Sequence, residues 1–194
     1  MHPILRIAAT LSLMAAGTVL AESPTAPPAN ANVEDAKTLI KTFAVTLKGE
    51  LESAMKQGGP TKAIAVCKER APAIAAQLSE TSGWTVGRTS LKTRNTAQNA
   101  PDAWERDVLV RFDARHAAGE PADTLAFGEV VESDGKRQFR FMKAIPTGDV
   151  CLACHGTQIA PAVAAALDQA YPGDQARGYK LGDVRGAFTL SKPM

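Results

Sequence analysis

The clearest chemistry in the sequence lies in five consecutive residues, Cys151, Leu152, Ala153, Cys154 and His155. Two cysteines three positions apart, followed at once by a histidine, form the attachment pattern of c-type haem. Each thiol adds across one vinyl group of the porphyrin to make a thioether, and the adjacent imidazole supplies a ligand to the iron. The motif therefore predicts one covalent haem c, held by Cys151 and Cys154, with the metal bound by His155.

Three other interpretations of this motif are weaker. A redox-active Cys-x-x-Cys pair usually opens a helix in a βαβ unit, whereas this one follows a predicted pair of strands. A disulfide between Cys151 and Cys154 is the second alternative. Zinc would need two such ligand pairs, and beyond the first 21 residues only Cys67 and His116 stand outside the motif. Since a chance match is expected only about 0.0007 times in such a chain, haem attachment is favoured.

The ligand on the other face of the iron decides the function, and residue types alone leave it open. The candidates are Cys67, His116, Met55, Met142 and Met194. Cys67 is either a small core residue or a ligand, because an odd cysteine in an oxidising compartment is a liability unless something holds it. His116 also fits a histidine at a helix end, beside the C-terminal dipole.

Arg88, Lys92 and Arg94 form a basic cluster in a short strand-to-loop stretch. Carboxylates bind guanidinium and ammonium groups through charge-assisted hydrogen bonds. The cluster therefore predicts that one or more of these residues pairs with the haem propionates, and the alternative is a solvated surface.

Two amphipathic helices precede these groups. Apolar residues recur every three or four positions from residue 33 to residue 54, after Asn32 as a cap and before a stop at Gly58 and Gly59. A second stripe over residues 61–78 turns Cys67 inward, and Pro72 is expected to kink this helix.

The rest of the chain mixes helices and strands. Helices are predicted over residues 99–119, with Pro101 in the first turn, and over residues 161–171. Strands are predicted over residues 84–90, 125–132, 137–145 and 184–190, with a hairpin turn at residues 133–136. Met142 is expected on the strand face opposite Phe139 and Phe141. Helices first and strands mostly later indicate an α+β domain around a small antiparallel sheet.

The amino-terminal residues predict export. Arg6 precedes an apolar run that ends at Ala21 with small residues, as in a secretory signal peptide over residues 1–21. Residues 22–32 fit a flexible leader, and residues 33–194 a single domain. We expect the mature protein in the periplasm, without a membrane span; a retained anchor is the alternative. The net charge of +2 argues against a nucleic-acid partner.

The chain resembles a family of bacterial c-type haem domains first catalogued as a domain of unknown function. The resemblance is carried by residues 63–68, 86–92 with Arg94 and Asn95, 99–105, 151–156, and 178–183 with Arg185 and Gly186. It implies a PAS-like sheet with long N-terminal helices packed around one covalent haem, with His155 as the proximal and Cys67 as the distal ligand. Thr96 departs from the pattern, where proline is expected after Arg94 and Asn95.

His and thiolate ligation predicts a redox or diatomic-gas sensor rather than an enzyme. Thiolate stabilises ferric iron, and reduction favours protonation and release of Cys67, which opens a position for CO or NO. A separate periplasmic redox or signalling protein would then be the partner. The alternative is a periplasmic electron-transfer cytochrome c, in which both ligands stay bound. A peroxidase-like enzyme would need a distal acid-base group, for which only His116 is available.

Overall fold

The computed structural model describes residues 29–133 and 135–194, so the predicted signal peptide lies outside the described residues. The order of elements is as follows: α1 Ala29–Ala65, π-helix η1 Val66–Arg70, α2 Ala71–Ser82, β1 Thr85–Thr89, α3 Thr96–Asn99, α4 Ala103–Ala117, 3-10 helix η2 Ala122–Thr124, β2 Ala126–Ser133, β3 Lys136–Pro146, α5 Asp149–His155, α6 Pro161–Ala170 and β4 Val184–Pro193. The α+β class is confirmed.

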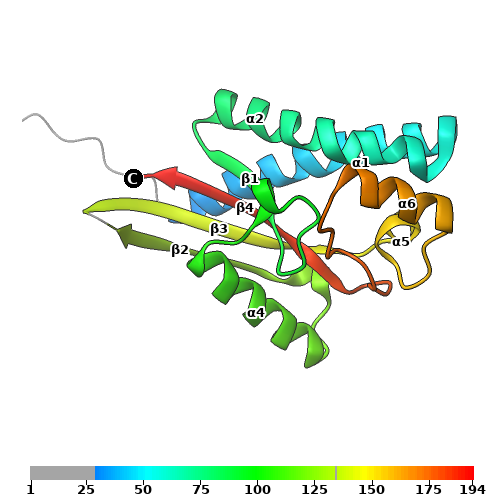
Figure 1. The fold of residues 1–194 in the computed structure, drawn as a ribbon. Helices are drawn as coiled ribbons and strands as arrows, with labels where there is room; N and C mark the ends of the chain where they lie inside the picture. Colours follow the sequence, from blue (N-terminus) through cyan, green and yellow to red (C-terminus); the bar gives the residue numbers. More distant parts are fainter. Residues whose placement is uncertain (1–28, 134) are drawn as a thin grey trace, which may run out of the picture.

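The four strands form one antiparallel sheet in the order β1-β4-β3-β2. Helices α1 and α2 lie over one face, α4 lies over the other, and α5 and α6 gather at one end (Figure 1). Successive side chains of β3 point to opposite faces of the sheet, so this strand contributes residues to the packing on both faces. Phe139 and Phe141 pack with α1 and α2, whereas Met142 is buried with α4, as predicted.

The long N-terminal helix is broken where two glycines meet. Gly58 and Gly59 leave helical geometry, and Gly59 has φ 67°, a conformation that glycine adopts without the Cβ penalty of other residues. The predicted stop is therefore confirmed as a kink, after which Pro60 begins the next helical stretch. The predicted start is wrong: the helix begins at Ala29, so residues 29–32 belong to it rather than to a flexible leader, and Asn32 is buried rather than a cap.

The helix predicted over residues 99–119 starts later than expected and covers Ala103–Ala117. Asn99 ends the short helix α3, and α4 starts at Ala103 with Asp102 as its N cap. The Asp102 carboxylate accepts from the backbone N–H of Glu105, and the Glu105 carboxylate accepts from the backbone N–H of Asp102. This capping box satisfies two amides that a helix start leaves unpaired, so Pro101 precedes the helix instead of opening it.

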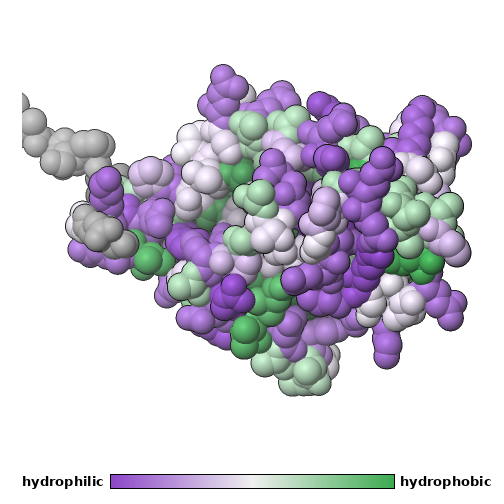
Figure 2. All heavy atoms as spheres, viewed as in Figure 1, coloured by the Kyte–Doolittle hydropathy of each residue, from purple (hydrophilic) through white to green (hydrophobic). Residues whose placement is uncertain are grey.

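The described residues give no continuous apolar face on the surface. The exposed large apolar residues are Val45, Val110, Val130, Leu181 and Met194, which come from five different parts of the chain. Figure 2 shows apolar residues on this side as separate spots among hydrophilic ones. In the part of the chain that the structure describes, no helix is long and apolar enough to span a membrane.

Candidate functional site

A cavity of about 610 Å³ opens between the helices α1 and α2, the strands β1 and β4, and the segment that carries α5. Seven residues were assigned from the sequence or the family resemblance to haem attachment, iron binding or the propionates, and six of them line the cavity, namely Cys67, Arg88, Arg94, Cys151, Cys154 and His155. The apolar part of its wall comes largely from α1, with Phe43, Leu47 and Leu51 among the lining residues. Lys92 is the exception and does not reach the cavity.

The Cys-x-x-Cys-His motif forms helix α5, which the sequence analysis missed. Gly148 caps the N-terminus and Gly156 the C-terminus. Cys151 and Cys154 are three positions apart on this helix, so they lie on neighbouring turns of one face, and both line the cavity as free thiols. Burial raises the pKa of the Cys154 thiol, so an uncharged thiol is favoured there before any reaction.

The ring of His155 is oriented by a backbone carbonyl. Its Nδ1 lies 2.7 Å from the carbonyl oxygen of Ala176. A carbonyl oxygen only accepts hydrogen bonds, so Nδ1 carries the proton and Nε2 keeps its lone pair. Burial, together with the charges of Arg185 and Arg94, lowers the pKa of His155 well below its ordinary value. The imidazole is therefore neutral, with Nε2 available to a metal, the usual arrangement for metal-binding histidines.

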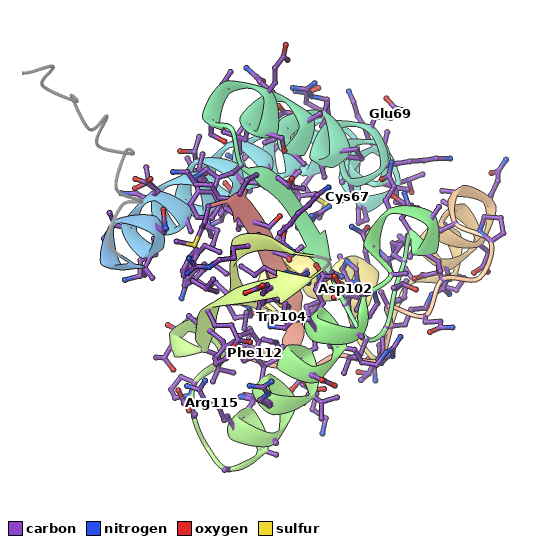
Figure 3. All side chains as sticks on the ribbon, turned by 90° about the vertical axis from the view of Figure 1, so that its left-hand side faces the viewer. Cys67, Glu69, Asp102, Trp104, Phe112 and Arg115 are labelled. Carbon is purple, nitrogen blue, oxygen red and sulfur yellow. The ribbon has the colours of Figure 1, made fainter. Side chains whose placement is uncertain are left out.

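Cys67 reaches the cavity from the single turn of π-helix, η1. The backbone N–H of Ala71 donates to the carbonyl of Val66, five residues earlier, and Pro72 follows at once. Proline has no N–H and crowds the preceding turn, so a widened turn here is the form that the predicted kink takes. Figure 3 shows Cys67 directed toward the interior of the molecule, whereas Glu69 points outward.

Two arginines contribute unpaired positive charge to the cavity. Arg88 comes from β1 and lies with its guanidinium 5.5 Å from the ring centroid of Phe43. Arg185 comes from β4, which pairs with β1, and it was not assigned a role from the sequence although it belongs to one of the stretches that carry the family resemblance. Neither guanidinium has a hydrogen bond or an ion pair with another described residue. Burial lowers the pKa of each, and for Arg88 the charge of Arg185 adds to this.

Lys92 and Arg94 do not join this pair, which corrects the predicted cluster. The Lys92 ammonium donates to the carbonyl of Arg177 and lies 4.5 Å from the ring centroid of Tyr179. Arg94 lines the cavity but pairs with Asp174 at 3.1 Å, and its side chain is only 9% exposed. Spacing along a loop does not decide side-chain direction, so the three basic residues end in different surroundings.

The other candidates for the second iron ligand differ in whether they line the cavity. Met55 lines the cavity. His116 lies near the end of α4, where its Nδ1 is 3.0 Å from the carbonyl oxygen of Glu120. Met142 is fully buried beneath α4, and Met194 is an exposed terminal residue. Of the five residues that the sequence left open, only Cys67 and Met55 line the cavity.

Comparisons with known proteins bear on the family and the fold of the chain. A family model described as Tll0287-like matches residues 22–193. The fold is similar to the crystal structure of the cyanobacterial heme-protein Tll0287, with a TM-score of 0.65 and 22% identity over 87% of this chain and 98% of that one. Among curated proteins, none matches the chain.

Proposed function

The chain belongs to the Tll0287-like family, and on that premise we propose that it is an exported protein with one covalent haem c and His/Cys ligation, which senses redox state or a diatomic gas. Membership confirms the resemblance inferred from the sequence. The observation that carries the proposal is the meeting of the Cys-x-x-Cys-His helix α5 and the Cys67 turn at one cavity with a largely apolar wall.

Cys151 and Cys154 are the groups that hold the porphyrin in this proposal. Each thiol adds across a vinyl group: the sulfur bonds to one carbon and the thiol hydrogen ends on the other, so no oxidant is needed. The two free thiols on one face of α5 suit this reaction, because a disulfide between them would first have to be reduced. When bound, the haem supplies an iron that cycles between ferrous and ferric states.

His155 and Cys67 are the two residues proposed to bind the iron. Support for His155 is its neutral ring, whose Nδ1 is held by the Ala176 carbonyl and whose Nε2 has only a long contact, 3.3 Å, with Nη1 of Arg94. Support for Cys67 is its place in the cavity wall.

Arg88 and Arg185 are also the residues proposed to pair with the haem propionates. In the described structure these two guanidinium groups have no carboxylate partner. The two propionates of a haem equal them in number and carry the opposite charge. The site residues therefore fit a haem at both ends, with thiols and imidazole on α5 and cations on β1 and β4. Lys92 and Arg94 are left out of this role.

The sensing step in this proposal is the loss of Cys67 from reduced iron. Thiolate ligation stabilises ferric iron, so we expect a lower potential than in a His/Met cytochrome. On reduction, Cys67 would take up a proton and move away from the iron, and CO or NO would then bind in its place. The widened turn at Cys67 gives the release a local hinge, because π-turns mark places where helical hydrogen bonding is already irregular. A separate periplasmic redox or signalling protein would receive the signal.

Electron transfer is the second candidate, and one observation favours it. Cys67 lies within a helical stretch that continues from Pro60 through the π-turn to Ser82 and so is held at both ends. This anchoring restrains large movements of the thiol, so both ligands would stay bound while the haem exchanges electrons with redox partners.

The test is low-temperature EPR of the ferric protein, matured in a host that attaches c-type haem. The wild type is expected to give a low-spin signal with the narrow g anisotropy of thiolate ligation. Cys67→Ser should lose it, and the matched control Met55→Leu should retain it, because Met55 is the other candidate ligand that lines the cavity. A signal unchanged by Cys67→Ser would reject thiolate ligation.

Carbon monoxide then separates the two functions. A CO adduct of the reduced wild type, accompanied by loss of the thiolate, supports the sensor. Reversible potential cycling with both ligands retained under CO supports the electron carrier.

A further inference from the structure

We propose that the buried ion pair of Arg94 and Asp174 positions His155 and tunes the potential of the iron that it binds. This inference rests on the proposed function and adds to it a pair of positioning residues that contact the imidazole and the backbone around it. Neither residue is assigned to binding the iron or the porphyrin.

Arg94 ties the end of the motif helix to a distant loop. Its Nη2 group donates to the carbonyl of Cys154 at 2.6 Å and to the carbonyl of Ala176 at 3.1 Å. Its Nη1 group lies 3.3 Å from Nε2 of His155. A metal at Nε2 would replace only the last of these contacts. The other donors keep the guanidinium against the backbone that carries the imidazole.

Asp174 contacts both Arg94 and the backbone that holds the ring of His155. It accepts from Nε of Arg94 at 3.1 Å and from the backbone N–H of Ala176 at 2.9 Å. The Ala176 carbonyl in turn accepts from Nδ1 of His155. One carboxylate therefore places the carbonyl that orients the ring, and one guanidinium shares that same carbonyl oxygen.

Sharing the carbonyl has an electronic consequence. A carbonyl that also accepts from a guanidinium is a weaker acceptor for the imidazole N–H, so His155 donates less electron density to a bound metal. The charges act as well: a nearby cation favours reduced iron, and a nearby anion favours oxidised iron. Because the Arg94 and Asp174 side chains are 9% and 1% exposed, water screens their charges only weakly.

The experiment measures the reduction potential of the covalently loaded protein by spectroelectrochemistry. Arg94→Gln leaves the Asp174 anion in excess, so the potential is expected below that of the wild type. Asp174→Asn leaves the Arg94 cation in excess, so the potential is expected above it. Arg177→Gln is the matched control, because Arg177 donates to the same carboxylate at 2.8 Å but is 29% exposed. Its shift is expected to be smaller than that of Arg94→Gln.

Arg94→Lys separates position from charge. Lysine keeps the positive charge but loses the planar fork that contacts two carbonyls at once. We expect a potential near that of the wild type together with a broader spread of EPR g values, because the imidazole is less firmly oriented. This variant also decides the question if the charge-removing variants fail to mature.

The inference is overturned if Arg94→Gln and Asp174→Asn shift the potential in the same direction, as a purely structural defect would. It is also overturned if Arg177→Gln shifts it as far as Arg94→Gln, or if Arg94→Lys matches the wild type in both potential and EPR spectrum. A wild type without covalent haem would instead reject the proposed function itself, and the inference with it.

Discussion

Replacing Arg88 by methionine should stabilise the protein without haem and destabilise the protein with haem. In the unloaded chain the guanidinium is a charge in a cavity wall, near the like charge of Arg185 and without a carboxylate partner among the described residues. Methionine keeps much of the apolar stem and removes the charge. In the loaded protein the same substitution deletes a proposed propionate contact, so the sign of the effect reverses.

The size of the first effect follows from the pKa. Burial, with the charge of Arg185, lowers the pKa of Arg88 from 12.5 to about 10. At about 1.4 kcal/mol for each pKa unit, keeping the group charged costs at most about 3.5 kcal/mol. Partial exposure and the lost contact with the Phe43 ring reduce this, so we expect a gain of about 1 to 2 kcal/mol. For a chain of this size that is a rise in melting temperature of about 4 °C.

The assay compares urea and thermal unfolding of two forms. The unloaded form carries Cys151→Ala and Cys154→Ala and is made without haem-attachment machinery. The loaded form retains both cysteines and should lose about 1.5 to 3 kcal/mol, the worth of a hydrogen bond to a charged group. Arg106→Met is the control, since Arg106 is an exposed arginine of α4, and its effect should stay within about 0.5 kcal/mol in both forms.

A loss of stability in the unloaded form would refute the reasoning. It would mean that the Arg88 charge is already compensated by a partner in the folded chain before haem binds. Equal effects of the same sign in both forms would likewise remove Arg88 from the proposed propionate site.

Three further outcomes are expected. Gly156→Ala places a Cβ 2.6 Å from the carbonyl oxygen of Leu152, so it should cost about 1 to 3 kcal/mol and lower covalent haem yield in stained gels; Gly148→Ala, which meets no atom within 4 Å, should not. Asp102→Ala should lower the free energy of unfolding by about 1 to 2 kcal/mol in urea titrations, through loss of the α4 cap, and leave the EPR spectrum unchanged. Because the pKa of His155 is lowered in the folded chain, its contribution to the stability of the unloaded form is present above pH 6.5 and lost as pH falls below it, by at most about 1.4 kcal/mol per pH unit. Unfolding curves from pH 5 to pH 8 check this slope, and an increase in stability on acidification would contradict it.

Regular elements were largely predictable, because hydrophobic periodicity reports which face of a helix or strand is buried. All four strands and the α6 helix lie within a few residues of their predicted ranges. The boundaries that failed depend on local hydrogen bonds: Asp102 and Asn99 are both good caps by type, and only the reciprocal bonds with Glu105 select Asp102. Helix α5 was missed because seven residues are too short to display a helical period.

The sequence by itself determined the reactive groups: the spacing of Cys151, Cys154 and His155 is sufficient to predict thioether attachment, since the motif is contiguous. Tertiary structure alone decided which distant groups join them. Cys67, Arg88 and Arg185 come from three separate elements, and their convergence depends on the pairing of β1 with β4 and on the packing of α1 and α2 over that sheet face. Tertiary contacts also direct Arg94 toward Asp174 and Lys92 away from the cavity. Side-chain direction in a loop is set by long-range contacts, which local spacing does not encode.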